Sequence, residues 1–244
     1  MDYVSNRISA RQTSRLKELA TFLALSDLSV DQGVTDFIEV RLDGEIVACG
    51  GVDHNIIKCV AIDPNHRGGG LSLRLVSELR NIAHDQGFYE LFLYTKPDNI
   101  PLFSACGFYP IVQHDNIIVL MENSPDRLKN YCKQLACQKH EGKKIGSIVM
   151  NANPFTLGHQ HLVKTAAAEC DWLHVFVVKE DVSFFPYQDR FELVKEGISG
   201  IEYVTLHPGS DYIISRASFP SYFLKTKEAV ENGYTALDLK LFRE

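Results

Sequence analysis

Long apolar runs and a leader peptide are both missing from this sequence. No stretch approaches the ~20 apolar residues that a membrane-spanning helix needs, and Met1–Ser5 lacks the basic-then-apolar pattern of a secretory signal. Internal repeats and low-complexity segments are absent as well. We therefore expect a cytoplasmic protein with no membrane partner.

Positive charge and paired cysteines are scarce. The chain carries 25 Lys and Arg against 31 Asp and Glu, which gives a net charge of −6. This balance argues against a nucleic-acid partner, because such a protein needs a basic face. The six cysteines form no C-x-x-C pair, so a zinc site is not expected. They indicate reduced, mostly buried thiols.

The sequence does have enough apolar material for two domains. Its 244 residues, of which 45% are hydrophobic, suit one large or two ordinary domains. Residues 37–42 and 45–52 are typical of two strands, and Asp43-Gly44 between them is a hairpin signal. Residues 56–62 indicate a third strand and residues 71–83 an amphipathic helix.

The pattern changes after residue 123. A polar, helix-like segment over residues 125–144 is typical of a connector, and Pro125 suits the first turn of a helix. Beyond it strand and helix patterns alternate, which indicates a parallel sheet with covering helices. These patterns cover residues 145–150, 158–168, 173–178, 187–199 and 203–206. We expect a first domain at 1–124, a helical connector at 125–144 and a second domain at 145–244.

The junction between the first strand and helix of the second domain carries the clearest chemical signal. Ile148–Met150 is apolar, Asn153-Pro154 breaks the strand, and a helix begins near Gly158. A helix start offers unpaired N–H groups and a positive dipole end, which suit a phosphate. Thr156 and His159 lie three residues apart, so their side chains project near one another. They are our candidate catalytic residues of a nucleotide site. The alternative is a strand–helix elbow with a capping threonine and a solvated histidine.

A second loop has the composition of a phosphate-binding turn. A strand ends at Ile62, Pro64 turns the chain, and Gly68–Gly70 leads into a helix. Glycines there let backbone N–H groups approach a pyrophosphate, and Arg67 adds a cation. A three-glycine loop is a weak signal by itself, so its surroundings decide its meaning.

Both loops resemble known signatures. The run Asn153-Pro-Phe-Thr-Leu-Gly-His159 resembles the T/H-x-G-H signature of the nucleotidyltransferase superfamily. This resemblance implies that Asn153, Phe155 and Gly158 contact the nucleotide.

The first domain resembles GNAT acyltransferases over roughly residues 10–121. Arg67-Gly-Gly-Gly-Leu-Ser72 is similar to their R-x-x-G-x-G/A loop, which cradles the pyrophosphate of CoA. Asn99–Phe108 is similar to the short helix that follows the next strand. The resemblance implies that Arg67, Gly68, Gly70 and Asn99 contact a CoA-like ligand.

Two departures separate this domain from a transferase. Phe103 stands where many such enzymes have a general-acid tyrosine, and Cys59–Ala61 offers no carboxylate base. Asp53-His54 could supply a base, although a turn pair of this kind is more often solvated. The domain is therefore better suited to holding a CoA-like ligand than to transferring an acyl group.

The two domains in this order resemble the citrate lyase ligase family. Further similar runs are Phe184–Arg190 and Gly209–Lys225. In that family ATP and acetate form acetyl-adenylate and pyrophosphate. The acetyl group then passes to the thiol of the dephospho-CoA-derived prosthetic group on the acyl-carrier subunit of citrate lyase. The resemblance implies ATP with Mg²⁺ as cofactors, and acetate and that carrier subunit as partners.

Other polar residues of the second domain are weaker candidates. Lys179 follows a strand at its carboxyl end, where open α/β sheets bind ligands; it could reach the triphosphate or lie on the surface. Glu180 and Asp181 could position Mg²⁺, although we assign no protein-held metal site. Ser215 could line the nucleotide site, and Arg190 is interpreted as structural.

The last residues set a further expectation. Members of the resembled family run beyond Glu244, so the Rossmann-like nucleotidyltransferase domain of this α/β chain is expected to be incomplete at its C-terminus. Leu237, Leu239, Leu241 and Phe242 would then lack partners. Two alternatives to the ligase stay open: an acyl-CoA-dependent N-acetyltransferase, and a truncated binding module without catalysis.

Overall fold

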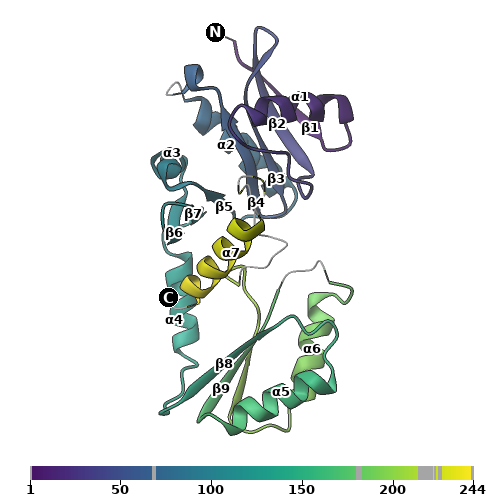
Figure 1. Cartoon of the computed structure of the whole chain (residues 1–244), viewed down its shortest axis with the longest axis vertical. Helices are drawn as coiled ribbons and strands as arrows, with labels where there is room; N and C mark the ends of the chain where they lie inside the picture. The colour runs from purple at the N-terminus through teal and green to yellow at the C-terminus, as the bar shows by residue number, and fades with distance from the viewer. Residues whose placement is uncertain are drawn as a thin grey trace. The chain divides into compact units, whose positions relative to one another are not determined.

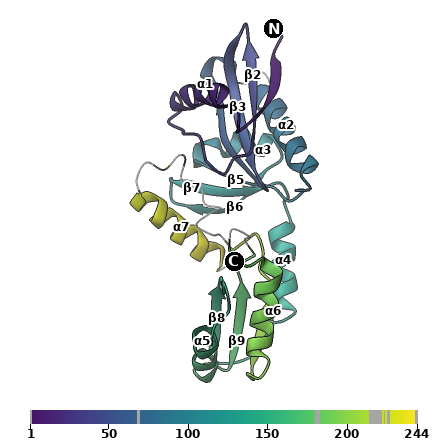
Figure 2. The same cartoon turned by 90° about the vertical axis from the view of Figure 1, so that its right-hand side faces the viewer.

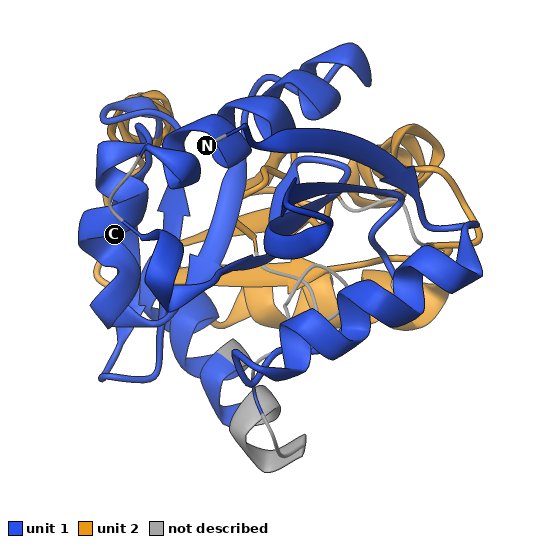
Figure 3. Ribbon diagram, turned by 90° about the horizontal axis from the view of Figure 1, so that it is seen from above, with its two compact units in different colours: residues 1–127, 218–243 blue, residues 128–217, 244 orange. Residues whose placement is uncertain are grey.

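The chain forms two compact units. A computed structural model describes residues 2–67, 70–179, 183–213, 222, 224 and 227–242, with only the backbone of 227–231 and 234. One unit contains residues 1–127 and 218–243, and the other contains residues 128–217 and 244 (Figure 3). The boundaries expected at 1–124, 125–144 and 145–244 remain predictions.

A seven-stranded sheet forms the centre of the first unit (Figure 1). Its order is β1-β2-β3-β4-β5-β7-β6, and every neighbouring pair is antiparallel except β4 with β5. The strands are β1 (Val4–Ser9), β2 (Asp36–Leu42), β3 (Glu45–Asp53), β4 (Ile56–Ile62), β5 (Phe92–Thr95), β6 (Tyr109–His114) and β7 (Ile118–Glu122). The predicted hairpin is confirmed: β2 and β3 pair around Asp43 and Gly44, whose φ angles are +51° and +90°.

Helices α1 (Thr13–Ala24) and α2 (Leu71–Asp85) cover opposite faces of this sheet (Figure 2). Side chains alternate along β2, so Ile38 and Glu39 point to opposite faces. Ile38 joins the apolar core that includes α2, whereas Glu39 meets Arg15 of α1. The apolar face predicted for residues 71–83 is confirmed. The buried residues of α2 are Leu71, Leu75, Val76, Leu79, Ile82 and Ala83.

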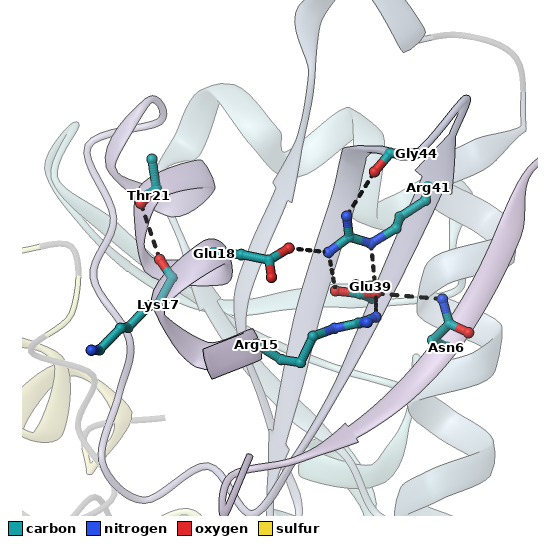
Figure 4. Close-up of polar contacts among 8 residues, drawn as sticks. All are labelled: Asn6, Arg15, Lys17, Glu18, Thr21, Glu39, Arg41 and Gly44. Carbon is teal, nitrogen blue, oxygen red and sulfur yellow. Dashed lines mark hydrogen bonds and ion pairs between the residues drawn. The ribbon is translucent and has the colours of Figure 1, made fainter. Parts of the chain in front are cut away.

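Glu39 is the centre of a polar cluster between α1 and the sheet (Figure 4). Its side chain is 0% exposed, and both Arg15 and Arg41 bind its carboxylate. Asn6 Nδ2 donates to the same carboxylate at 3.4 Å, and Arg41 also binds Glu18. Two guanidinium groups offset the cost of burying a carboxylate. The cluster therefore stabilises the packing of α1 against β2.

Strands β4 and β5 separate soon after they meet. Their pairing covers only Ile56 with Phe92 and Ile57 with Leu93, although β4 continues to Ile62. Cys59, two residues past the last pair, has a φ of +55°, and the register of β4 against β3 is irregular in this part of the strand. The sheet consequently opens in its middle.

The final helix, α7 (Lys227–Leu241), lies against β6 within the first unit. Leu237 and Leu241 are 0% and 5% exposed, because a spacing of four places them on one helix face. Lys240 Nζ donates to the carbonyl of Gln113 at 3.0 Å. The expectation that Leu237 and Leu241 would lack partners is wrong, whereas Leu239 and Phe242 are exposed. Helical spacing identifies an apolar face but not the sheet that it will meet.

The second unit is a three-stranded parallel sheet with two covering helices (Figure 1). Its strands lie in the order β10-β9-β8, and the apolar core on one face packs against α5 and α6. The elements are β8 (Ile145–Met150), α5 (Leu157–Ala168), β9 (Trp172–Val177), α6 (Tyr187–Ile198) and β10 (Val204–His207). The predicted alternation of strand and helix is confirmed.

Two shorter α-helices and two 3-10 helices, η1 (Pro64–His66) and η2 (Pro97–Asn99), complete the described elements. Helix α3 (Ile100–Ala105) belongs to the first unit, and α4 (Arg127–Ala136) lies in the segment expected to be a helical connector. Across the described parts of the chain, every helix is too short or too polar to cross a lipid bilayer.

Candidate functional site

In the second unit, the loop after β8 leads into the start of α5. Thr156 caps this helix with an extended backbone, φ −127° and ψ 169°. Thr156 and His159 form a capping box, in which the Thr156 side chain accepts from the N–H of His159. The other N–H groups of the first turn lie at the positive end of the helix dipole. A Cβ at Gly158 would meet only the Thr156 hydroxyl, at 3.6 Å, so this glycine leaves the helix start uncovered.

Thr156 fixes the proton arrangement of His159. Its backbone N–H donates to His159 Nδ1 at 3.1 Å, and its Oγ1 lies 2.8 Å from the same nitrogen. A ring nitrogen that accepts from a backbone N–H carries no proton, so the neutral imidazole is protonated at Nε2. His159 therefore presents an Nε2–H donor at the start of α5.

Phe155 supports the imidazole from one side. Its ring stacks on His159 with centroids 5.6 Å apart and an interplanar angle of 27°. Gly197 of α6 makes room for that ring, since a Cβ there would come within 2.2 Å of Phe155 Cε1. Gln160 Nε2 donates to the Gly197 carbonyl at 2.7 Å, which joins the two helices at the same point. The ring's position is thus set by packing between α5 and α6.

Two asparagines in the loop after β8 form hydrogen bonds with residues 183–185. Asn151 and Ser183 exchange hydrogen bonds of 3.1 and 3.2 Å, and Asn153 Oδ1 accepts from the Phe185 N–H at 3.0 Å. The Asn153-Pro154 peptide bond is cis. The side-chain carbonyl of Asn153 is therefore used within the protein, and its contact with a nucleotide remains a prediction.

Arg190 joins three segments at the same edge of the sheet. It is 0% exposed, and its guanidinium donates to the carbonyls of Phe185, Asn151 and Val178 at 3.0, 2.7 and 2.9 Å. It also donates to Asn151 Oδ1 at 2.9 Å and lies over the ring of Tyr187. These contacts agree with the structural interpretation of Arg190. Its partners among the described residues include carbonyl oxygens of neighbouring loops.

Lys179 lies at the same end of the sheet as Thr156. Met150 and Val177 are paired neighbours in parallel strands, so the residues that follow them emerge at one edge. Lys179 is exposed, and its Nζ lies 3.2 Å from Asp211 Oδ2. Gly209 allows this arrangement, because a Cβ there would lie 2.0 Å from the Val177 carbonyl oxygen. Lys179 is therefore an exposed cation held at the edge where ligands bind.

Several predicted residues lie outside the described part of the chain. Ser215 is one, together with Glu180 and Asp181, the candidates for positioning Mg²⁺. Among the residues that the structure does describe, no group of three or more His, Cys, Asp or Glu could hold a metal ion. The nucleotide-site candidates that can be compared are thus Asn153, Phe155, Thr156, Gly158, His159 and Lys179.

The first unit contains a cavity of about 370 Å³ where β4 and β5 separate. Arg67 and Asn99, both predicted to contact a CoA-like ligand, line this cavity together with Lys96. Asn99 Nδ2 donates to Thr95 Oγ1 at 3.0 Å, which fixes its side chain next to the end of β5. A volume of this size lies at the lower end of the usual range for small-molecule sites.

The glycine loop follows the end of β4. Gly70 adopts a φ of +78° and caps α2, a conformation that favours glycine. A Cβ at Gly70 would meet nothing within 4 Å, so its backbone is open to a ligand. Gly68 lies outside the described residues. The loop leaves the α2 start without a side-chain cap.

The residues at positions where a GNAT transferase would carry catalytic groups are buried. Phe103 is 5% exposed and belongs to the apolar core, and it carries no hydroxyl. Burial raises the pKa of Cys59 to about 12, so its thiol stays protonated and is a poor nucleophile. Lys58, also in β4, is neutralised by Asp31 and Asp53 at 3.1 and 2.7 Å. Asp53 is thus committed to an ion pair.

Two family models match successive parts of the chain. The GNAT acetyltransferase family model matches residues 6–108, and the model of the citrate lyase ligase C-terminal domain matches residues 145–244. The chain is 53% identical over 230 residues to the citrate (pro-3S)-lyase ligase of Klebsiella pneumoniae, which covers 94% of this chain and 67% of that protein. It is 50% identical over 241 residues to the Escherichia coli K12 protein of the same name, covering 99% and 68%.

The chain belongs to the citrate lyase ligase family. A ligase from Haemophilus influenzae is 48% identical over 238 residues, covering 97% of this chain and 71% of its own length. The predicted order, a GNAT-like domain followed by the α/β domain of this family, is confirmed. Among solved structures, an acyl-CoA N-acyltransferase from Pseudomonas aeruginosa is similar over 50% of this chain and all of its own, at 13% identity and a TM-score of 0.42.

The residues of these sites that the sequence reasoning missed include Lys96, Asp211 and Tyr222. Asp211 pairs with Lys179 across 32 positions, and Tyr222 lines the cavity of the first unit. The run Gly209-Ser-Asp211 after a strand is a turn signal that could have indicated Asp211. For Tyr222 the sequence offers no comparable signal, because it lies far along the chain from β4 and β5.

Proposed function

We propose that this family member is an ATP-dependent acid–thiol ligase. It would activate acetate as acetyl-adenylate and then acetylate a thiol on the acyl-carrier subunit of citrate lyase. The ligase names of its relatives support ligation in general. The finer steps rest on the geometry of the second unit.

The reaction has two balanced steps. In the first, an acetate oxygen attacks the α-phosphorus of ATP, the bond from that phosphorus to the β-phosphate bridge breaks, and pyrophosphate leaves. In the second, a thiolate attacks the acetyl carbon and AMP leaves with the bonding electrons. Neither step needs an oxidant or reductant. Both depend on positioning the reactants and on stabilising negative charge.

The observation that carries the proposal is the fixed donor at the start of α5. Thr156 holds His159 so that Nε2–H is presented where helix N–H groups also lie. Negative charge grows on the α-phosphate oxygens during attack, and a fixed donor there stabilises it. Lys179, at the same sheet edge, adds a cation for the leaving pyrophosphate.

ATP would enter with Mg²⁺, which supplies positive charge against the phosphates. The donor groups of the described residues include no cluster that would hold this ion alone, so phosphate oxygens would supply most of its ligands.

The first unit is proposed to hold the prosthetic arm of the carrier. Arg67 and Lys96 line its cavity and would attract a phosphate group, and the open backbone at Gly70 allows close approach. N-acetyl transfer is disfavoured there, because Phe103 lacks a hydroxyl and Asp53 already pairs with Lys58.

The first prediction is that His159→Ala lowers acetate-dependent exchange of pyrophosphate into ATP by roughly 10²–10³-fold, the usual effect of removing one transition-state donor. This exchange reports adenylation without the carrier. His161→Ala is the matched control, because His161 is exposed on the same helix. Equal exchange by the His159 variant and the unmodified protein would remove His159 from the site.

A further inference from the structure

The cavity between β4 and β5 contains a side chain from the far end of the chain. Tyr222 lines this cavity with Tyr94 and Phe103, and it is only 8% exposed. It belongs to the part of the first unit that follows residue 217. The chain therefore returns to the cavity after completing the second unit's sheet.

Tyr222 is held at both its backbone and its side chain. The Ser29 N–H and hydroxyl donate to the Tyr222 carbonyl at 3.2 and 3.3 Å. Its phenol hydrogen-bonds with the backbone of Cys59, whose thiol donates to the Ser29 carbonyl at 3.4 Å. Burial raises the pKa of the phenol well above its usual value, so the group stays neutral. The Tyr222 ring is therefore a fixed part of the cavity wall.

The contacts of Tyr222 locate it near the end of the cavity where β4 and β5 are still paired, which we call the closed end. Cys59 comes two residues after Ile57, the last residue of β4 that pairs with β5. Arg67 comes after the end of β4, so it marks the other, wider end. A ligand whose anionic group binds Arg67 and Lys96 would therefore point its opposite end towards Tyr222.

An extended chain with amide groups suits the space between these ends. The backbone of β4 beyond Ile57 borders the cavity through Val60, Ala61 and Ile62 rather than pairing with β5. Such strand edges bind extended ligands through main-chain hydrogen bonds. A phosphopantetheine-type arm has this form: a phosphate at one end, two amides, and a thiol at the other end.

We propose that Tyr222 limits this cavity to the thiol form of a phosphopantetheine-type ligand and excludes the acylated form. The proposal rests on the assignment of the first unit to the carrier's prosthetic arm. The ring stands where the atoms beyond the sulfur would have to lie, so the thiol substrate is accepted and its thioester product is one acyl group too long. Tyr222 is thereby a specificity-determining residue that favours release of the product.

Binding without ATP tests this directly. We expect calorimetry with the full chain to show that dephospho-CoA binds roughly 10-fold or more tightly than its S-butyryl derivative, with the S-acetyl derivative between them. Equal affinity for the three ligands would overturn the proposal. So would the absence of binding by all three.

Two substitutions separate the ring from its hydroxyl. Tyr222→Ala should bring the three affinities to within about threefold of one another by opening the closed end. Tyr222→Phe keeps the ring and should retain the discrimination. If Tyr222→Ala loses cooperative melting, Tyr222→Leu takes its place, since it also shortens the side chain. Unchanged discrimination in the shortened variant would contradict the role of Tyr222.

The test is independent of the ligase chemistry. Acetate-dependent pyrophosphate exchange by the unmodified protein reports the second unit, whereas thiol binding without ATP reports the first. If the protein showed no pyrophosphate exchange but still distinguished the thiol from its thioesters, only the ligase proposal would be overturned. Acetyl transfer from acetyl-CoA to an amine would instead show that the cavity accepts an acyl group, and would overturn the inference.

Discussion

Glu39 in the first unit and Arg190 in the second are both fully buried charged side chains, but they are held in contrasting ways. In the first unit Glu39 meets two guanidinium groups, and the resulting cluster fastens α1 to β2 (Figure 4). In the second unit Arg190 donates to carbonyl oxygens of three segments around the start of α5. A buried charge thus stabilises a helix–sheet contact in one case and shapes a candidate active site in the other.

The comparison teaches that burial alone does not identify function. Both side chains are 0% exposed and each has several hydrogen bonds. The difference lies in what they hold: Glu39 contacts side chains of regular elements, whereas Arg190 contacts the loops that carry Asn151 and Phe185. Loops at strand ends are where catalytic groups are presented.

The largest effect on stability should follow from removing Arg190. Arg190→Gln would leave several buried carbonyls without a donor and lower the unfolding free energy of the second unit by about 3–5 kcal/mol. Pyrophosphate exchange should fall by about 10²-fold, since displaced loops misalign the reactants. Thermal melting and exchange assays measure both. Lys195→Gln, at an exposed position of the same helix, is the control. Full exchange in Arg190→Gln would make Arg190 a purely stabilising residue.

The next largest effect on stability should come from acid, which is expected to lower the unfolding free energy of the second unit. Burial, with smaller contributions from His174 and His140, lowers the pKa of His207 from 6.5 to about 4. The unfolded chain therefore takes up a proton between pH 6.5 and about 4 while the folded one does not, so stability falls across this window by at most about 3 kcal/mol.

Unfolding midpoints measured at several pH values would follow this loss. The His207 Nδ1 atom is buried without a hydrogen-bond partner in the described structure, and the ring stacks on Phe176. His207→Phe would remove the 2.7 Å hydrogen bond between His207 Nε2 and His174 Nδ1, but it should keep the stacking on Phe176 and flatten the pH dependence. An unchanged slope in that variant would show that other groups titrate in this range.

A smaller loss is expected for Glu39→Gln. The variant removes the charge that Arg15 and Arg41 share, but both guanidiniums are partly exposed and can be solvated. We expect the first unit to lose about 2–3 kcal/mol of unfolding free energy. Pyrophosphate exchange should be unchanged, in contrast to Arg190→Gln. Glu45→Gln, at an exposed position of the neighbouring strand, is the control for denaturant melts. If Glu39→Gln also lost pyrophosphate exchange, Glu39 and Arg190 would not differ in their effect on activity.

The smallest effect on stability is expected for Lys179→Ala. The ion pair between Lys179 and Asp211 is exposed, so its loss should cost less than about 1 kcal/mol. The KM for ATP should nevertheless rise about 10-fold if the ammonium group contacts the triphosphate. Lys164→Ala, on the exposed face of α5, provides the comparison. Equal KM values for the two variants would make Lys179 a surface residue.

Local patterns allowed much of the fold to be predicted. The turn at Asp43-Gly44, the apolar face of α2 and the alternating strands and helices after Ile145 all depend on near neighbours in the sequence. Thr156 and His159 were also predictable as a pair, because three residues separate them at a helix start. Their role in catalysis remains a prediction.

Long-range contacts could not be predicted in the same way. Leu237 and Leu241 form an apolar face whose partner strand, β6, lies more than 100 residues earlier. The Lys179–Asp211 pair and the position of Tyr222 likewise depend on how distant segments meet. Periodicity predicts which face of a helix is buried, but only the folded structure shows which element that face packs against.

The return of the chain to the first unit has a consequence for synthesis. Ser29 and Tyr222 are 193 positions apart, and Gln113 and Lys240 are 127 apart. The strands of the second unit, by contrast, pair with neighbours close in sequence, and such local contacts form early. On the ribosome the first 127 residues of the first unit emerge well before residues 218–243, with which they form these contacts. Until residue 222 leaves the exit tunnel, the cavity between β4 and β5 lacks the part of its wall that Tyr222 supplies.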